Sequence, residues 1–440
     1  MANYFRVLYY LVNMVRRTHL DRDELIKYQN KKLRKMIKHA YDSVPFYHKK
    51  LRELGTKPSD IKTAKDLGKL PIIRKDEIRK NLNEMICREY DVENLEMHWT
   101  SGSTGQPLLF YITKEEDDFR KAKHLRGNIC CGQKPRDCWV TITPPFRFAR
   151  TTKLQRILGF YAPIPISVLE DSAKQVSIIE KIKPDIMDGY SSSLFLLAKE
   201  AEKRESKAIR PRFLFGGAEL TDDVSRRYVE KVFEAPFYDR YATIELERMA
   251  WQCPARMEYH IDADTIIMQF VDANGEEVSA GERGEIVCTS LFNYAMPFIR
   301  YAIGDMGIPS DEECSCGRTF PLMKVIEGRK DSLIVLPDGR VLSPRTFTIA
   351  IRMFKLYKHM DQFRVIQKKP DLLEIHIKKK NDDVDESIME TELVAHIKKM
   401  LNIDEHKITF KVKFVENIPL DKSGKLMIVV SELKTNLQVK

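Results

Sequence analysis

The chain has 440 residues, of which 43% are hydrophobic and 31% are charged. This composition is typical of a folded globular protein and excludes disordered and fibrous classes, and the length predicts roughly two to four domains or subdomains. Lys and Arg number 74 against 64 Asp and Glu, a net charge of +10 that suits an anionic ligand such as a nucleotide. Because charges of both signs are interspersed, and no basic stretch carries interleaved aromatic residues, we do not expect a nucleic-acid partner.

The apolar segment 5–15 comes nearest to a membrane-spanning sequence. It is shorter than the roughly 18 residues that cross a bilayer, and it contains Arg6 and Asn13. Arg16 and Arg17 follow it instead of preceding it, unlike the basic part of a signal peptide. We therefore expect no transmembrane segment and interpret 5–15 as an amphipathic helix packed on the body of the protein. A membrane-surface helix is the second interpretation, because Phe, Leu and Tyr with flanking Arg suit an interface.

Apolar residues with helical spacing predict a helical N-terminal region over residues 1–95. Leucine, isoleucine and alanine recur at helical intervals between residues 23 and 54. The sequence Val44-Pro45-Phe46-Tyr47 interrupts this pattern, and Arg74-Lys75-Asp76 marks a second helix start.

Short apolar runs alternate with helical stretches between residues 96 and 328, so we expect an α/β core with largely parallel sheets. The runs lie at 108–112, 139–142, 186–187, 213–215 and 237–238. Two strands on either side of Asn274-Gly275 predict a more antiparallel segment over 266–289. A small α+β domain is expected over 329–440, with strands at 333–335, 341–342, 372–377 and 408–415 and a helix over 384–400.

The most informative motif is Thr100-Ser101-Gly102-Ser103-Thr104-Gly105-Gln106-Pro107, between two expected strands. Hydroxyls and glycines this close together form a loop whose backbone N–H groups and side-chain oxygens can wrap a polyphosphate. The lysine of a Walker P-loop is absent from this motif. A lysine from another part of the chain must then supply the positive charge.

Four further segments carry candidate polar groups. They are Tyr241-Ala242-Thr243-Ile244-Glu245, Arg300-Tyr301-Ala302-Ile303-Gly304-Asp305, Gly328-Arg329-Lys330-Asp331 and Pro419-Leu420-Asp421-Lys422-Ser423-Gly424-Lys425. Glu245 at the end of an expected strand is suited to hold Mg²⁺ against nucleotide phosphates, although a single strand-end Glu is more often a surface residue or a helix cap. Asp305 follows a glycine in an expected loop, where its carboxylate can accept two hydrogen bonds from a ribose diol.

In this order and at these separations, the five segments resemble the adenylate-forming superfamily of acyl-CoA synthetases, firefly luciferase and peptide-synthetase adenylation domains. The sequence is most similar to the phenylacetate-CoA ligase branch and its CapK relatives from capsule biosynthesis. That narrower resemblance rests on Tyr41 to Tyr47, Phe215-Gly216-Gly217-Ala218-Glu219, Tyr241 to Cys253 leading into His260 to Asp264, and Cys314 to Thr319. It covers nearly the whole chain. It implies a large multi-subdomain adenylation domain, with an AMP-binding core at 96–328, and a small mobile α+β C-terminal domain that rotates about a hinge near Lys330 and Asp331.

The resemblance also implies a role for each matched residue. ATP phosphates would be contacted within the loop by Ser101, Gly102, Ser103, Thr104 and Gly105. Glu245 would bind Mg²⁺, Asp305 and Arg329 would hold the ribose, and Lys425 would be the missing lysine, approaching the carboxylate and the α-phosphate as negative charge develops. The adenine would be bordered by Gly216, Gly217, Ala218, Glu219, Tyr241, Ala242 and Thr243, with the Tyr241 ring near the base.

The function implied is ATP-dependent activation of a small carboxylic acid through an acyl-adenylate, followed by transfer to CoA. A CapK-like transfer to an amine, a hydroxyl or a carrier protein, as in polysaccharide biosynthesis, is the alternative. The family usually has Gly at the position of Ala242 and a hydroxyl residue at that of Ile244, so a non-catalytic nucleotide-binding module is a further alternative. Family members are often dimers, which makes a homodimer one expected assembly.

The cysteines carry a separate prediction. Eight cysteines in 440 residues do not form the dense framework of a small secreted domain, which favours a reducing cytoplasm. Cys253 and His260 form C-x₆-H, and Cys314 and Cys316 form C-x-C. Three thiolates and one imidazole would complete a closed tetrahedral site for a structural Zn²⁺. The alternative is four unconnected residues.

Overall fold

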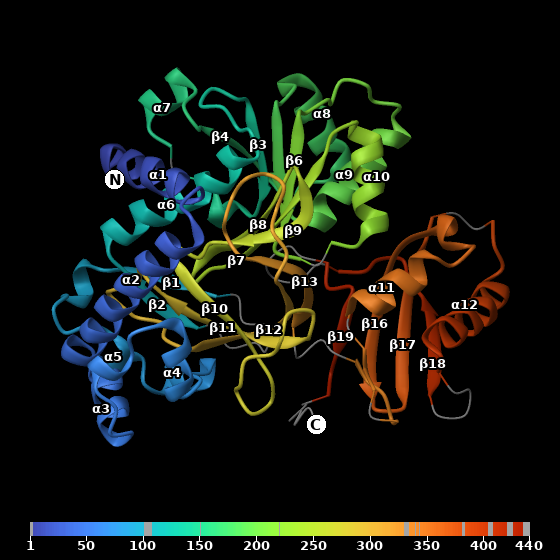
Figure 1. The fold of residues 1–440 in the computed structure, drawn as a ribbon. Coiled ribbons are helices and arrows are strands. Elements are labelled where there is room, and N and C mark those ends of the chain that lie inside the picture. The colour runs from blue at the N-terminus through green and yellow to red at the C-terminus, as the bar shows by residue number, and fades with distance from the viewer. Residues whose placement is uncertain are drawn as a thin grey trace. The chain divides into compact units, whose positions relative to one another are not determined.

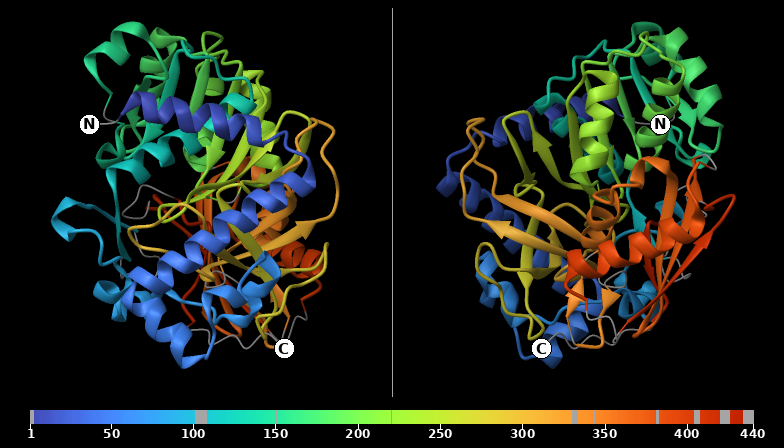
Figure 2. Two further views of the ribbon diagram at one scale, coloured as in Figure 1. Left: turned by 60° about the vertical axis from the view of Figure 1, so that its left-hand side comes forward. Right: turned by 90° about the vertical axis from the view of Figure 1, so that its right-hand side faces the viewer.

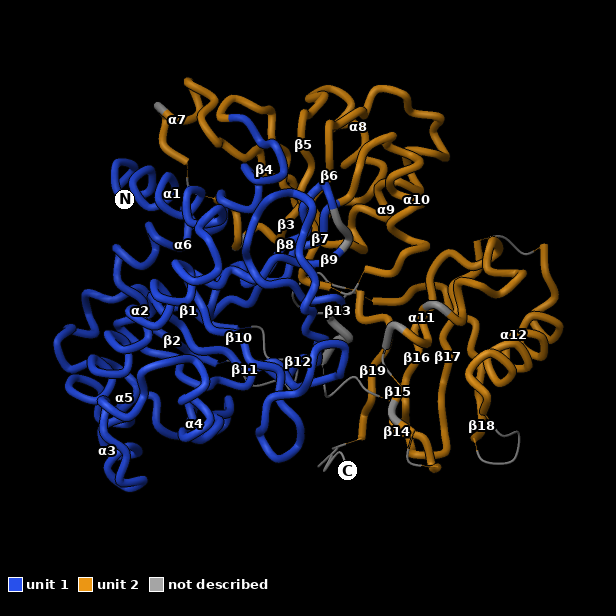
Figure 3. Tube along the Cα trace, in the orientation of Figure 1, with its two compact units in different colours: residues 1–134, 238–326 blue, residues 135–237, 327–440 orange. Residues whose placement is uncertain are grey.

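The computed structural model describes residues 3–100, 108–149, 151–219, 221–329, 334–338, 340–342, 344–380, 383–403, 408–419 and 426–433. The chain forms two compact units, each made from two separate segments, residues 1–134 with 238–326 and residues 135–237 with 327–440 (Figure 3). In the parts of the chain given above, no helix has the length and apolar character needed to cross a bilayer.

The first unit combines the N-terminal helices with a mainly antiparallel sheet (Figure 1). Its helices are α1 (Tyr4–Arg17), α2 (Arg22–Ser43), α3 (Pro45–Glu53), α4 (Lys75–Lys80), α5 (Leu82–Met85) and α6 (Lys114–Cys130). Strands β1 (Glu96–Trp99) and β2 (Leu109–Ile112) form an antiparallel ribbon. The sheet has the order β10-β11-β12-β13-β9-β8-β7. Its strands are β7 (Phe237–Thr243), β8 (Glu247–Cys253), β9 (Arg256–Ile261), β10 (Ile266–Val271), β11 (Gly284–Ser290), β12 (Tyr301–Ser310) and β13 (Leu322–Arg329).

Local sequence signals explain where the N-terminal helices begin. The Asp21 side chain caps α2 by accepting a hydrogen bond of 2.8 Å from the Glu24 N–H. Pro45 occupies the first turn of α3, and Val44 before it is extended, as a residue preceding proline prefers. The predicted interruption of the helical pattern at Val44-Pro45 is therefore confirmed.

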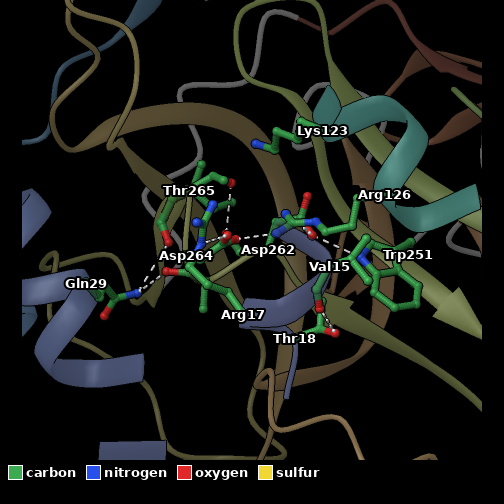
Figure 4. A network of polar contacts seen from close by, with 12 residues as sticks. Val15, Arg17, Thr18, Gln29, Lys123, Arg126, Trp251, Asp262, Asp264 and Thr265 are labelled. Carbon is green, nitrogen blue, oxygen red and sulfur yellow. Dashed lines mark hydrogen bonds and ion pairs between the residues drawn. The ribbon is translucent and has the colours of Figure 1, made fainter. Parts of the chain in front are cut away.

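A fully buried charge network lies within the first unit (Figure 4). The Arg126 guanidinium pairs with Asp262 at 2.7 Å and with Asp264 at 2.5 Å, and none of these side chains is exposed. Arg17 at the end of α1 reaches Asp264 at 2.8 Å. The Trp251 indole N–H donates to Asp262 at 2.9 Å. These contacts join α1, α6 and the segment after β9.

The second unit contains a parallel sheet with the order β6-β5-β3-β4. Its strands are β3 (Trp139–Thr143), β4 (Pro163–Ser167), β5 (Ile186–Gly189) and β6 (Phe213–Gly217), and its helices are α7 (Lys153–Leu158), α8 (Ser172–Ile182), α9 (Ser191–Lys203) and α10 (Asp223–Phe233). Every residue of β5 and β6 is buried, which explains why Ile186-Met187 and Phe213 to Phe215 are apolar without alternation.

Residues 327–440 contribute a four-stranded sheet, ordered β18-β17-β16-β19, with its own apolar core. The elements are β14 (Ile334–Val335), β15 (Val341–Leu342), α11 (Pro344–Arg352), β16 (Met360–Lys369), β17 (Leu372–Lys379), α12 (Glu386–Leu401), β18 (Thr409–Phe414) and β19 (Val429–Ser431). Short 3₁₀ turns occur in the chain at Pro58–Asp60, Ala64–Lys69, Val92–Asn94, Pro145–Arg147 and Tyr357–His359.

The predicted α/β class, the parallel core strands and the small α+β C-terminal region are confirmed. The predicted antiparallel segment is also present, but its connection is longer than a tight hairpin. Gly275, with φ +85°, closes a turn that bridges Val271 to Glu277, whereas the strand that pairs with all of β10 starts only at Gly284. The Asn-Gly signal located the turn and missed the start of the next strand.

Candidate active site

Glu245 lies in the short turn between β7 and β8, as its sequence position predicted. The side chain is 3% exposed, and the Tyr301 hydroxyl donates a hydrogen bond of 2.7 Å to its Oε1 atom. A second oxygen, Oε2, belongs to the same buried carboxylate. Because Tyr301 starts β12, a strand from elsewhere in the sheet fixes the orientation of the acid.

Two cations from helix α6 hold the backbone of this turn. Arg120 donates to the carbonyl oxygens of Ile244 at 2.6 Å and Glu245 at 3.0 Å. The Lys123 Nζ donates to the Leu246 carbonyl at 3.0 Å. The Arg120 guanidinium also lies over the Phe110 ring of β2, 5.8 Å from its centroid. The helix therefore links the Glu245 turn to the strand that follows the Ser/Thr/Gly loop.

A second acid borders this turn. Glu247 accepts a hydrogen bond from His124 at 3.0 Å and pairs with Arg120 at 3.5 Å. Burial opposes its ionisation, yet the His124 hydrogen bond and the Arg120 charge lower the pKa of Glu247 to about 2. Glu247 is thus a structural anion beside the turn.

Asp305 and Tyr241 meet in the first unit, since the Tyr241 hydroxyl donates to the Asp305 Oδ2 atom at 2.7 Å. The expected loop around Asp305 is wrong, because Asp305 lies within strand β12. A glycine before Asp305 suggests a turn from the sequence, and Gly304 does have φ +91°. However, pairing with β11 resumes at Met306 and Gly307, so this is an irregularity within the strand. The ring of Tyr241 is buried, and its hydroxyl positions the acid.

The two departures from the family pattern have different environments. Ala242 is exposed at the end of β7, so its methyl group, which the family's usual glycine lacks, does not enter the core. Ile244 is half-buried against the main apolar cluster of the first unit. Thr243 accepts a hydrogen bond from the Leu246 N–H at 3.1 Å and closes the turn that carries Glu245.

The predicted adenine segment belongs to the second unit. An added Cβ atom at Gly216 would lie 2.0 Å from Cζ of Phe237, so packing alone requires glycine there. Ala218 has φ +62°, and Gly217 ends strand β6. The Glu219 Oε2 atom accepts a hydrogen bond of 2.8 Å from the Ser192 N–H in the first turn of α9. Glu219 therefore acts as a helix cap in this arrangement.

Several predicted site residues lie outside the described residues. They are Ser101, Gly102, Ser103, Thr104, Gly105 and Lys425. Arg329 ends strand β13. The ends of the 101–107 segment are joined, because Thr100 N–H donates to the Leu108 carbonyl at 3.0 Å and Leu108 N–H donates to Thr100 Oγ1 at 3.1 Å. Together with the β1–β2 pairing, this confirms that the motif connects two neighbouring strands.

Comparisons with known proteins extend over most of this chain. No family model matches the sequence. It is 25% identical to the phenylacetate-coenzyme A ligase of Thermus thermophilus over 77% of this chain and 78% of that protein. It is 21% identical to protein CapK of Staphylococcus aureus over 94% of this chain and 90% of CapK. A crystal structure of 2-hydroxyisobutyryl-CoA ligase with 2-HIB-AMP has the same fold, with a TM-score of 0.78 at 22% identity over 91% of this chain and 88% of that one.

Over most of its length the chain is thus similar to adenylate-forming ligases of the phenylacetate-CoA ligase and CapK kind.

The fold also brings the four predicted zinc ligands together. Ligand atoms of Cys253, His260, Cys314 and Cys316 all lie within 4.8 Å of one another. The Cys253 and Cys314 sulfurs are 3.5 Å apart, and the Cys316 sulfur is 3.4 Å from His260 Nε2. Ligands around a tetrahedral Zn²⁺ with bonds of about 2.3 Å are separated by about 3.7 Å. The donor set and its spacing therefore fit zinc.

Burial shifts the pKa of two groups in this cysteine cluster. It raises the pKa of Cys314 to about 12 and lowers the pKa of His260 to about 4. The His260 ring stacks on Trp251 at 4.9 Å, which fixes its plane beside the ends of β8 and β9. A divalent cation favours deprotonated thiols and neutral imidazole, so metal binding would reverse the effect of burial on Cys314.

Sequence reasoning missed the residues that position the acids. Tyr301 lies within the segment Arg300 to Asp305, but nothing in the sequence of that segment indicates that the Tyr301 hydroxyl reaches Glu245. Arg120 and Lys123 lie on a helix rich in charges, where each is equally consistent with a solvated position. Burial distinguishes Arg120 and Lys123 from solvated residues, and only the folded structure shows that burial.

Proposed function

We propose that this protein activates a carboxylic acid with ATP, forming an acyl-adenylate and pyrophosphate, and then transfers the acyl group to CoA. Two relatives named phenylacetate-coenzyme A ligase, from Thermus thermophilus and Pseudomonas putida, support this reaction class. The observation that carries it is the pair of oriented acids in the first unit, Glu245 held by Tyr301 and Asp305 held by Tyr241.

Each acid matches one part of the nucleotide. The Glu245 carboxylate fits Mg²⁺, a hard cation that takes a few carboxylate oxygens and completes its shell with phosphate oxygens and water. When bound, this ion would neutralise phosphate charge. The Asp305 carboxylate would accept hydrogen bonds from ribose hydroxyls, and the Tyr241 hydroxyl would keep it oriented. The loop 101–107 would donate hydrogen bonds to phosphate oxygens.

The reaction has two displacements. A carboxylate oxygen of the acid attacks the α-phosphorus of ATP, and the bond to pyrophosphate breaks. The CoA thiolate then attacks the acyl carbonyl carbon, and AMP leaves with the bonding electron pair. Lys425 would stabilise the charge that develops in the first step. Neither step needs an oxidant or a reductant.

The acyl acceptor separates the two enzymatic candidates. CapK is similar over 94% of this chain, which favours considering an amine, a hydroxyl or a carrier protein beside CoA. We would incubate the protein with ATP and a panel of carboxylic acids, with and without CoA, and identify products by mass spectrometry. Acyl-CoA with AMP supports the ligase. Acyl-AMP that is trapped only by hydroxylamine, with no acyl-CoA, supports another acceptor, and ATP binding without any acyl product supports the non-catalytic module.

We also propose that Cys253, His260, Cys314 and Cys316 hold a structural Zn²⁺. The fit of ligand type and spacing supports it, and four protein ligands leave no coordination position for water. Metal analysis of the purified protein should give about one zinc per chain. The Cys314→Ser variant should lose the metal, whereas Cys288→Ala, which changes a buried cysteine outside the cluster, should keep it. Retention of zinc by Cys314→Ser would reject the site.

The remaining expectations are a cytoplasmic location and, as one assembly, a homodimer. The eight cysteines support the location, because all of them are free thiols and thiols stay reduced in a reducing compartment such as the cytoplasm.

A further inference from the structure

Helix α1 has two apolar faces, and only one of them packs against the protein. Val7, Leu11 and Met14 are buried against helix α6. On the opposite face, Phe5 is 89%, Leu8 58%, Tyr9 66% and Val12 50% exposed. Spacings of three and four residues align these four side chains in one row, which we call the outer stripe. In Figure 2 (left), α1 is the darkest blue helix and crosses the near side of the ribbon.

Polar contacts hold both ends of α1 in place. Near the N-terminus, Arg6 pairs with Glu115 and Asp118 at the start of α6, each at 3.3 Å. At the other end, Arg17 pairs with the fully buried Asp264 at 2.8 Å. Because these contacts fix how the helix is turned about its axis, the outer stripe cannot rotate inward. A continuous row of four exposed apolar side chains is thus held facing outward.

The stripe is too small to be a dimer interface by itself. A helix of 14 residues is about 21 Å long, and an exposed face about 10 Å wide would give about 200 Å² of contact, against about 800 Å² per partner in a stable complex. The face of a single helix is also convex. A flat, deformable surface can take up such a row, whereas a second protein would need a matching groove.

The charge of α1 indicates which flat surface it suits. The helix contains three arginines and no acidic residue. Arg16 continues the row from Val12 at a spacing of four residues, is exposed, and lies in the last turn. An aromatic and aliphatic row that ends in arginine matches the boundary between lipid acyl chains and anionic headgroups.

We propose that α1 docks flat on an anionic lipid surface. The outer stripe enters the headgroup region, Tyr9 places its ring at the interface with its hydroxyl toward water, and Arg16 pairs with headgroup phosphates. The body of the protein stays in the aqueous phase. This inference does not depend on the proposed reaction.

Co-sedimentation of the full chain with lipid vesicles tests the docking. We expect binding to vesicles of phosphatidylcholine with phosphatidylglycerol, and at least tenfold weaker binding to phosphatidylcholine alone. The double variant Leu8→Ser/Tyr9→Ser should bind the anionic vesicles at least tenfold more weakly. The matched control Met353→Ser/Ile388→Ser changes two side chains that are 58% and 55% exposed elsewhere, and it should bind as the wild type does.

Two further measurements keep the outcomes separate. Arg16→Glu should weaken binding to anionic vesicles and remove most of its salt dependence. The melting temperature of Leu8→Ser/Tyr9→Ser without lipid should match that of the wild type, which shows that the variant is folded. Wild-type protein that ignores anionic vesicles, or a stripe variant that binds them equally well, would overturn the proposal. It would also be overturned if sedimentation velocity showed a wild-type dimer that the stripe variant converts to monomers.

Discussion

The hydroxyl of Tyr301 should matter more to the reaction than to the fold. In Tyr301→Phe the ring remains and only the donor to Glu245 Oε1 is removed, at 2.7 Å and with both side chains buried. A hydrogen bond to a charged group contributes about 1.5–3 kcal/mol. If Glu245 orients Mg²⁺ and the phosphates, loss of the Tyr301 hydrogen bond to Glu245 should slow adenylation about 10- to 100-fold, as for other groups that orient a metal ligand. It should also raise the Mg²⁺ concentration needed for half-maximal rate.

Tyr47→Phe is the matched control. The Tyr47 hydroxyl is also buried in the first unit, where it donates to the Pro297 carbonyl at 3.0 Å and accepts from the Ile299 N–H at 3.1 Å. Both variants should lose stability by about 1–3 kcal/mol in urea unfolding. Acid-dependent pyrophosphate exchange, measured across Mg²⁺ concentrations, should fall only in Tyr301→Phe. Equal exchange rates in the two variants would refute the role given to Glu245.

Three further predictions concern the buried charges and the cysteines. Arg126→Met removes the guanidinium that two buried carboxylates share and should lower the free energy of unfolding by about 3–5 kcal/mol. Lys38→Ala removes an exposed pair with Asp42, at 2.9 Å, and should change it by less than about 1 kcal/mol; urea titrations of both variants provide the comparison. Burial lowers the pKa of Lys123 to about 8 in the folded protein, against about 10.4 in an unfolded chain. The unfolded state binds more protons between these values, so Lys123 should make stability rise with pH from about 8 to about 10.4; thermal unfolding across this range should show a smaller rise in Lys123→Met. Removing zinc with a chelator should lower the melting temperature of the wild type and leave that of Cys314→Ser unchanged, and an identical decrease in both would argue against the metal site.

The sequence located the motifs well because each has a local chemical signature. The Ser/Thr/Gly motif follows a strand and precedes another, and Glu245 comes two residues after the end of β7. The four proposed zinc ligands lie in two segments of the sequence, yet soft donors are rare enough that their grouping indicated a common site, and the structure brings them together. Parallel strand β5 was recognisable from the short apolar run Ile186-Met187, and every residue of the strand is buried.

Strand pairing and contacts between residues far apart in the sequence were not predictable in the same way. A glycine directly before Asp305 suggests a loop from the sequence. That glycine does have a positive φ, but the pairing of β12 with β11 shows that Asp305 lies in a strand. Arg126 is a common residue in a charged helix, but it is fully buried because Asp262 and Asp264 arrive from 136 and 138 positions further along the chain. Such long-range pairs have no signature within either segment.

Acid-dependent exchange of labelled pyrophosphate into ATP tests the central claim most directly, because it reports adenylate formation before any acyl acceptor is involved. We expect at least one acid in a broad panel of carboxylic acids to drive exchange in the wild type, and we expect Glu245→Gln and Lys425→Ala each to lose most of it. ATP binding without exchange for any acid, or full exchange in both variants, would contradict the account.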